Sequence, residues 1–176
     1  MRAKWLCLVA LTAAVGCGEG RAIFNIDVFS FLSNVNADTL PYSGPLPLGL
    51  QDTIPVQTVN SIGIGGSSIV DTVRLTGSVD FVNDTGTGNV HFAVYFDTLK
   101  SRVYLGDSAF SVSGAVTPGM TTPSSFDIPD LPTALKPLFL ASTVYVGIRA
   151  SVTGAVQGTA KLRALRARIV IKDKIF

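Results

Sequence analysis

Short runs in which apolar and polar residues alternate are the feature of this sequence that most restricts its fold. In the run 69–83, Val73, Leu75 and Val79 occupy alternate positions with polar side chains between them, and the run 90–97 repeats the pattern. A period of two places the apolar side chains of a run on one face of a β-strand, whereas a helix would spread them around its axis. The sequence therefore predicts half-buried strands.

The residues between these two runs have a strong turn propensity. Asn83–Asn89 has the sequence NDTGTGN, and Asn, Asp and Gly tolerate the positive φ angles of tight turns. We therefore expect the runs 69–83 and 90–97 to pair with each other as a β-hairpin.

The whole pattern of alternating runs and turn signals predicts an all-β fold, an antiparallel β-sandwich of about seven to nine strands. Glu19 is the only glutamate, while Val, Thr, Ser and Gly are abundant, and this composition favours strands over surface helices. Further strands are expected at residues 22–32, 102–105, 109–116 and 143–153, a helical turn at 133–140, and a loop at 36–55. We expect residues 22–176 to form this single domain.

The first residues of the chain have the parts of a secretory signal peptide. Arg2 and Lys4 precede an apolar segment, Trp5–Val15, which ends at small residues. A membrane-spanning helix needs about 20 apolar residues, so this segment is too short to cross a bilayer by itself. We therefore expect residues 1–16 to be removed on export.

The end of this segment, Ala14-Val15-Gly16-Cys17, resembles the lipobox of bacterial lipoproteins, although the family usually has Leu where Ala14 stands. The resemblance implies that Cys17 receives a lipid, becomes the new amino terminus and holds the protein on the periplasmic or outer surface face of a bacterial membrane. Residues 17–21 would then be a tether that reaches at most ~17 Å. An ordinary signal peptide followed by an unrelated cysteine is the alternative.

Residues that carry catalytic or metal chemistry are scarce. Cys7 lies in the segment expected to be removed, so the exported chain would keep only Cys17 and form no internal disulfide. His91 is the only histidine and lies on the polar face of its run, and the Gly-x-Ser-x-Gly motif of serine hydrolases is absent from the sequence. One histidine and one lipidated cysteine are too few ligands for a common zinc site. We therefore predict no enzyme, no catalytic residues, no metal and no cofactor, and the sequence identifies no small-molecule substrate.

Charge is distributed unevenly along the chain. Residues 17–160 carry a net charge of −5, whereas residues 161–176 carry +5. This last stretch also alternates, with Leu165, Ala167 and Ile169 on one face, so Arg166, Arg168 and Lys172 should point the other way. The basic residues are Lys161, Arg163, Arg166, Arg168, Lys172 and Lys174. We predict that they form a partner-binding surface.

Three explanations of this basic strand stay open. Charges, Lys in particular, keep an edge strand from pairing with other molecules, so the residues would simply protect a sheet edge. Alternatively the strand docks on an acidic protein partner, or on anionic lipid headgroups, where each basic residue contributes about 1 kcal/mol. Nucleic acid is not an expected partner, because an exported protein does not meet it and the sequence offers no aromatic platform for bases.

The leading functional hypothesis is a lipid-anchored, non-catalytic accessory or structural subunit docked to a membrane protein assembly. A stand-alone ligand-binding or adhesive surface lipoprotein is the alternative, and exposed aromatic residues around Tyr42 or Tyr104 would favour it. A small hydrolase is the third hypothesis, and it would need an acidic cleft that the sequence does not indicate.

Overall fold

The structure of the protein, a computed structural model, describes residues 20–44, 52–60 and 68–173. The elements in chain order are β1 (Gly20–Asp27), α2 (Val28–Ser33), β2 (Thr39–Ser43), β3 (Asp52–Thr53), β4 (Gln57–Asn60), β5 (Ile69–Asp97), the short 3-10 helix η1 (Lys100–Arg102), β6 (Phe110–Val116), β7 (Thr121–Ile128), a second 3-10 helix η2 (Lys136–Leu140) and β8 (Thr143–Asp173). All strand pairs are antiparallel. The prediction of an all-β, sandwich-like fold is confirmed.

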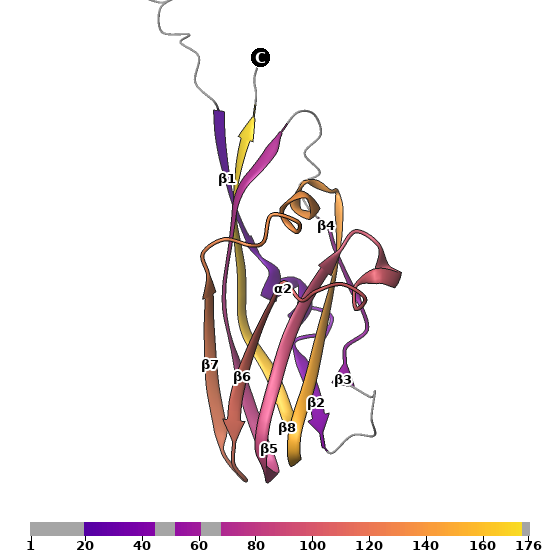
Figure 1. Ribbon diagram of the computed structural model, residues 1–176, viewed down its shortest axis with the longest axis vertical. Coiled ribbons are helices and arrows are strands. Elements are labelled where there is room, and N and C mark those ends of the chain that lie inside the picture. Colours follow the sequence, from indigo (N-terminus) through magenta and orange to yellow (C-terminus); the bar gives the residue numbers. More distant parts are fainter. Residues whose placement is uncertain (1–19, 45–51, 61–67, 174–176) are drawn as a thin grey trace, which may run out of the picture.

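Two long strands, β5 and β8, form the centre of the fold. They pair with each other from Ile69 opposite Lys172 to Asp97 opposite Tyr145. Both strands reverse direction together at the lower end of Figure 1, near residues 83–89 of β5 and 153–158 of β8. The two-stranded ribbon is therefore folded over on itself, and each strand contributes one half to each of two layers.

The shorter strands extend these two layers. The first layer contains residues 69–82 of β5 and 159–173 of β8, with β7 beside β5 and with β1 and β2 beside β8. The second layer contains the other halves of the long strands, with β6 beside β5 and with β3 and β4 beside β8. The strand order ends at β1 on one side and at β6 on the other, so the sheet is not closed.

The predicted hairpin between residues 69–83 and 90–97 is wrong. A strand has two pairing sides, and in the first run these are taken by β7 and β8, whereas in the second they are taken by β6 and β8. The turn residues instead allow β5 to bend. The pairing skips one residue between Asn83 and Thr85, which is a β-bulge, and Gly86 has a φ of +76°. The same chemistry that makes tight turns here changes the direction of a continuous strand.

A hydrogen-bond network holds this bend. Asn83 is the one buried polar side chain of the described residues, and its Nδ2 donates to the Gly86 carbonyl oxygen at 2.7 Å. The buried Tyr42 hydroxyl donates to the Val82 carbonyl oxygen at 3.2 Å and lies 3.4 Å from Asn83 Oδ1. Because a buried polar group that loses its partner costs about 1–3 kcal/mol, these contacts fix the bend as well as connect it to β2.

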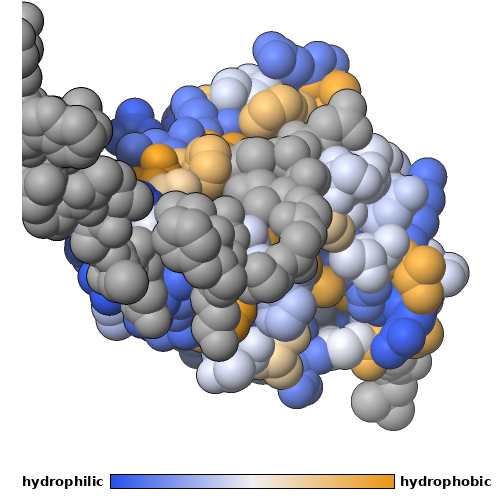
Figure 2. Space-filling model, turned by 90° about the horizontal axis from the view of Figure 1, so that it is seen from above, coloured by the Kyte–Doolittle hydropathy of each residue, from blue (hydrophilic) through white to orange (hydrophobic). Residues whose placement is uncertain are grey.

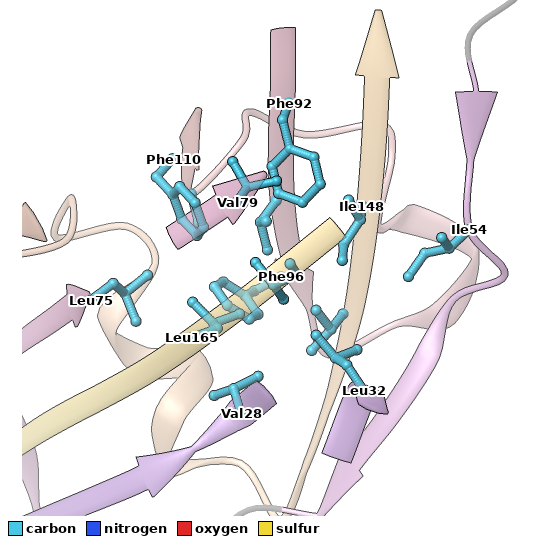
Figure 3. Packing of buried hydrophobic residues seen from close by; sticks show 14 of the residues in the cluster. Val28, Leu32, Ile54, Leu75, Val79, Phe92, Phe96, Phe110, Ile148 and Leu165 are labelled. Atoms are coloured by element: carbon cyan, nitrogen blue, oxygen red, sulfur yellow. The ribbon is translucent and has the colours of Figure 1, made fainter. Parts of the chain in front are cut away.

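The hydrophobic core fills the space between the layers and one side of it is covered by α2. Side chains from both long strands and from α2 point toward one another in this core, including Leu75, Phe92, Ile148 and Leu32 (Figure 3). The apolar residues of the terminal run are buried as its alternation predicts: Leu165, Ala167, Ile169 and Ile171. Each large side chain buried in this way contributes about 1.5–3 kcal/mol.

Several other local predictions are corrected. The run 22–32 ends as a strand at Asp27 and continues as α2, and the loop predicted at 36–55 contains β2 and β3. The strand predicted at 102–105 is wrong, because η1 and turns occupy this stretch.

Sequence reasoning also missed the strand β7, since its Pro123 reads as a strand breaker. β7 is an edge strand, where the missing N–H of a proline leaves no pairing partner unsatisfied. The helical turn predicted at 133–140 is present as η2.

Hydrophobic and hydrophilic residues are interspersed at the end of the molecule where β1 begins and β8 ends (Figure 2). Ile23 and Ile69, both more than half exposed, belong to this end. Among the described residues, no helix is long and apolar enough to cross a membrane.

Candidate binding site on the outer face of the first layer

The basic carboxyl-terminal run is a central strand of the first layer. Residues 166–173 of β8 lie between β1 and β5, and residues 157–161 lie between β2 and β5. The interpretation of its charges as protection of a sheet edge is therefore wrong, because this run is not at an edge. Arg166 and Arg168 instead project from the outer face of the layer, as the alternation predicts.

Two of the six predicted binding residues are held in ion pairs next to bulges. Lys172 Nζ lies 2.9 Å from Asp71 Oδ1, and Arg163 Nε lies 2.7 Å from Asp80 Oδ2. Asp71 and Arg163 are themselves the residues that the β5–β8 register skips. A bulge turns the extra side chain out of the alternating pattern, so these irregularities bring each carboxylate and its cation together.

Asp71, the ion partner of Lys172, is also close to other positive charges. The hydrogen bond from Lys172 lowers the pKa of the Asp71 carboxyl, and the positive charges of Lys172, Arg21 and Lys136 act in the same direction. Arg21 Nη2 lies 3.9 Å from the same carboxylate. The end of the layer near Gly20 therefore holds several cations around one shared carboxylate.

Arg166 and Arg168 line a shallow hollow in the middle of the same face. Its volume is about 350 Å³, and it is lined by Asn25, Ile26, Asp27, Arg74, Thr76, Arg166, Ala167 and Arg168. In the part of the chain that the structure describes, no carboxylate lies within 4.0 Å of either Arg166 or Arg168. Three guanidinium groups and one carboxylate thus surround one open groove, which we call the arginine groove.

The register places the groove residues in two rows across the sheet. Asn25, Arg168 and Arg74 form one row on β1, β8 and β5, and the next row contains Asp27, Arg166 and Thr76 on the same strands. Guanidinium groups with free donors bind carboxylates and phosphates in a bidentate manner. The arrangement suits recognition of an anionic group, and the row of Asn25 is the more positive of the two.

Arg74 is the one groove arginine with an ion partner among the described residues. Its Nε donates to Asp127 Oδ1 at 2.8 Å, and a second bond joins Nη2 to Oδ2. The hydrogen bond that Arg74 donates to Asp127 raises the pKa of Arg74, and the same contact lowers the pKa of Asp127. This fork holds the Arg74 guanidinium over β7, at the far wall of the groove from β1.

The remaining predicted site residues lie elsewhere. Lys161 is half-buried and is paired in register with Asp80 on one side and Thr39 on the other. Cys17 and Lys174 lie outside the described residues. Sequence reasoning also missed Arg74 and Asn25 as groove residues, because their role depends on which strands are neighbours; their position on the polar face of a run was the available signal.

His91 is exposed on the outer face of the second layer, as predicted. Its Nδ1 lies 2.9 Å from Ser113 Oγ on β6, the residue directly opposite in register. A serine nucleophile needs its histidine to be oriented by a third group, and Ser113 is the one side-chain partner of His91 among the described residues. No group of three or more His, Cys, Asp or Glu side chains in the described parts is arranged to hold a metal ion.

Arg149 forms a second cluster of polar and aromatic groups, on the outer face of the second layer. Its guanidinium carbon lies 5.0 Å from the ring centre of Tyr95 and 4.9 Å from that of Tyr104, and Nη2 donates to the Tyr104 carbonyl oxygen at 3.3 Å. The Tyr104 hydroxyl accepts from the Ile148 backbone N–H at 3.1 Å, and burial raises its pKa. The cluster fastens the segment after β5 onto the sheet, which is a structural role.

Comparison with known proteins gives no family. No protein-family model matches the chain, and the search of curated proteins found no match. Solved structures similar to it include a chain of the T13 particle of infectious bursal disease virus, which is 12% identical with a TM-score of 0.43, over 86% of this chain and 35% of the viral one. A protein of Bacillus endospore appendage pili is 14% identical with a TM-score of 0.29, over 89% and 93% of the two chains.

The module TmCBM61, solved with β-1,4-galactotriose, is 11% identical with a TM-score of 0.34, over 86% of this chain and 83% of its own. The chain spans little more than a third of the length of the viral proteins that it matches. Similarity at these identities and TM-scores supports no conclusion about function.

Proposed function

We propose that this protein is a lipid-anchored, non-catalytic, extracytoplasmic β-sandwich that acts as a structural or accessory subunit of a membrane protein assembly. The observation that carries the proposal is the arginine groove. Arg166 and Arg168 project from a central strand into a groove without ion partners among the described residues, while the neighbouring Lys172 and Arg163 are paired with aspartates. Cations kept apart from the internal ion pairs of a face are available to an external partner.

The position of the groove along the sheet favours a protein partner over the membrane itself. If a lipid on Cys17 anchors the chain, β1 leads away from the bilayer from Gly20 onward. Asn25, the neighbour of Arg168, lies five residues further along, which is roughly 17 Å at the rise of a strand. Attraction between exposed charges and headgroups is largely screened beyond about 8 Å at physiological ionic strength. The groove is thus better placed for an acidic surface of a neighbouring protein.

The alternative of a stand-alone adhesive or ligand-binding lipoprotein loses one feature that would favour it. Tyr42 is buried at the bend and Tyr104 is half-buried with a hydrogen-bonded hydroxyl, so neither presents an exposed aromatic ring. The hypothesis of a hydrolase has even less support, since His91 and Ser113 lie exposed on a sheet face. Both remain outcomes of the experiment below.

The test is native mass spectrometry of the protein extracted in mild detergent from the membranes of the cells that make it. The proposal expects a particle larger than the protein alone, in which this chain carries the added mass of acyl groups, and a Cys17→Ser variant that lacks this mass. Charge reversal at Arg166→Glu with Arg168→Glu should release the chain from the particle. A matched reversal at two exposed cations of η1, Lys100→Glu with Arg102→Glu, should leave it bound.

Two results would contradict the proposal. A lipidated chain that runs alone under all extraction conditions would favour the stand-alone lipoprotein. An intact chain without added mass and with a free thiol at Cys17 would remove the membrane anchor, and with it the argument about the distance of the groove from the bilayer.

A further inference from the structure

The edge of β1 is unusually open for a sheet edge. Within the described residues β1 is the last strand of its layer, and it runs for 8 residues against β8 without a bulge or a proline. Natural proteins protect such edges with prolines, bulges or short strands, because a regular edge offers a row of unpaired N–H and C=O groups to any other strand. The opposite edge of the same layer is protected in this way, since Pro123 lies in the middle of β7.

The side chains of β1 also leave this edge accessible. Ala22 is exposed and Phe24 and Ile26 are only half-buried, although all three point to the inner face of the layer. On the outer face, Ile23 is 52% exposed. An added strand would cover apolar surface on both faces of β1, which is the usual driving force for strand addition.

The arginine groove begins directly beside this edge. Asn25 is the short side chain between the edge and Arg168, and the Arg74 guanidinium lies on the far side of Arg168 in the same row. A side chain on the outer face of a strand added to β1, opposite Asn25, would lie in this row, two strand spacings or roughly 10 Å from the backbone of Arg168 and within the span of the two side chains. A carboxylate there would meet a cation that has no ion partner among the described residues.

We infer that the β1 edge binds an extended, acidic segment of a partner protein, which adds as a further strand to the first layer and places a carboxylate in the arginine groove in the row of Asn25, Arg168 and Arg74. The backbone of β1 supplies the strand pairing and the arginines supply the preference for acidic side chains. That the partner belongs to a membrane assembly rests on the proposed function, and so does the exclusion of an antiparallel second copy given below; the strand addition itself does not.

A second copy of this chain fits the same edge less well. In parallel pairing, Arg21 would lie beside Arg21 and Asp27 beside Asp27, and like charges directly opposite each other destabilise a strand pair. Antiparallel pairing would bring Arg21 opposite Asp27, but it would turn the second copy upside down. If a lipid on Cys17 anchors each chain, as the proposed function has it, the second Gly20 would then lie a strand length away from the membrane, roughly 26 Å, which the few residues between Cys17 and Gly20 do not span.

The test uses the full chain purified from its own cells and a defined probe. The probe is an acetylated and amidated peptide of alternating threonine and aspartate, as long as β1 at 8 residues, and its match has asparagine in place of aspartate. We expect the aspartate peptide to bind at least about tenfold more tightly, since a hydrogen bond between two charged groups is stronger than one between neutral groups. We expect hydrogen exchange, measured by NMR, to slow at every second backbone N–H of β1, because alternate N–H groups of an edge strand point outward.

Three variants examine the charge preference. Arg168→Gln should weaken binding of the aspartate peptide about tenfold and leave the asparagine peptide unchanged. Asp27→Asn should tighten it, since Asp27 is the one carboxylate that lines the groove. Arg102→Gln, which removes an exposed cation from η1, should change the affinity for neither peptide.

Several results would overturn the inference. Equal affinity of the two peptides would mean that the arginines give no preference for acidic side chains. Tight binding without slowed hydrogen exchange in β1 would mean that the peptide contacts the outer face of the layer and does not add as a strand. Alternate N–H groups that are already protected in the free protein would mean that a segment of the chain itself or a second copy covers the edge, and sedimentation would distinguish the two. Binding to vesicles of anionic lipid that is lost in Arg168→Gln would assign the groove to the membrane.

The outcomes separate the inference from the proposed function. If the chain forms a large membrane particle but the peptide does not protect β1, the function stands and the inference fails. If the peptide protects β1 while mass spectrometry finds a single chain without lipid, the binding edge stands and the proposed function fails.

Discussion

Arg74 and Arg168 lie directly opposite each other on neighbouring antiparallel strands, and both project from the outer face of the first layer. Like charges at directly opposed positions destabilise a strand pair, while Arg21, Arg163 and Lys172 of this layer each have an aspartate within 4.0 Å. Asp127 binds Arg74 and turns it toward β7, whereas Arg168 has no ion partner among the described residues. Stability of the sheet alone therefore does not account for two arginines at these opposed positions.

The first prediction concerns the stability of the Arg168→Gln variant. Removing one of the two opposed charges should raise the free energy of unfolding at low salt by about 0.2–1 kcal/mol. This gain in stability should shrink as salt is added, because salt screens the repulsion between exposed charges and shortens the distance over which it acts, which is about 8 Å at physiological ionic strength. Urea unfolding of the two proteins at low and high salt measures both effects.

Arg163→Gln is the matched control for this variant. It removes an arginine from the same strand, but one whose Nε is 2.7 Å from Asp80 Oδ2. Loss of an exposed pair costs about 0–1 kcal/mol, so this variant should be equally stable or less stable than the parent protein. If both variants gain the same stability, then repulsion from Arg74 is not the cause. A gain in Arg168→Gln together with the loss of acidic-peptide binding would mean that the residue is kept for binding.

The strands and their faces could be predicted from the sequence, because a period of two depends only on the local order of residues. Val73, Leu75 and Val79 are fully buried, and Arg166 and Arg168 are exposed, as their alternation requires. The pairing of strands depends on contacts between distant residues and could not be predicted in the same way. Nothing near Arg74 in the sequence indicates that Arg168 is its neighbour.

The turn residues of β5 show why local chemistry misled the prediction. The sequence NDTGTGN favours positive φ, and the structure does use one positive φ there, at Gly86. A hairpin requires the two flanking runs to pair with each other, but β6, β7 and β8 compete for the same pairing sides and occupy them. Local propensity identified where the chain changes direction, and tertiary contacts decided how.

A second prediction tests the bend through two glycines with the same backbone requirement. Gly86 and Gly119 have φ angles of +76° and +69°. A Cβ added at Gly86 would lie 1.6 Å from the Ala155 carbonyl oxygen, whereas a Cβ at Gly119 would have no atom within 4 Å. Gly119→Ala should therefore cost only the strain of a left-handed residue, about 1–2 kcal/mol. Gly86→Ala should cost a further 1–3 kcal/mol, roughly the cost of overpacking a filled site.

The two variants are compared by urea unfolding under the same conditions. Equal losses of stability would mean that β8 moves away from Gly86 without cost, and that the close contact between the two bent strands does not hold the layers together. A greater loss in Gly119→Ala would contradict the assignment of the bend to residues 83–89.

A third prediction concerns the stability of the bend in alkaline solution. Burial raises the pKa of Tyr42 from 10.0 to about 12, and the charge of Asp84 adds to the shift. In the unfolded chain the Tyr42 hydroxyl loses its proton near pH 10, whereas in the folded protein it stays protonated until the pH approaches about 12. The contribution of Tyr42 to stability is therefore fully present below pH 10 and is lost as the pH rises to about 12.

The measurement compares the protein with Tyr42→Phe, whose side chain has no proton to lose. The difference in the free energy of unfolding between the two proteins should be constant below pH 10 and should move in favour of Tyr42→Phe between pH 10 and about 12. Other alkaline groups titrate equally in both proteins and cancel in the difference. A difference that stays constant over the whole range would mean that the Tyr42 hydroxyl is open to solvent.

A fourth prediction follows from the carboxylate that Lys172 binds at the open end of the first layer. The hydrogen bond from Lys172 is the main reason why the pKa of Asp71 lies below its usual value of 3.8, and the charges of Lys172, Arg21 and Lys136 contribute in the same direction. Because the folded pKa is the lower one, the stability that Asp71 contributes is present above pH 3.8 and is lost as the pH falls through its folded pKa. An NMR titration of the side-chain carboxyl carbon gives this pKa directly.

Two variants show which cation holds the Asp71 carboxylate. In Lys172→Gln the pKa of Asp71 should rise toward 3.8, and in Arg21→Gln it should rise less, since Arg21 is 3.9 Å away and Lys172 is 2.9 Å away. The reverse order would mean that Arg21, and not Lys172, holds the carboxylate, and that Lys172 is available for a partner after all.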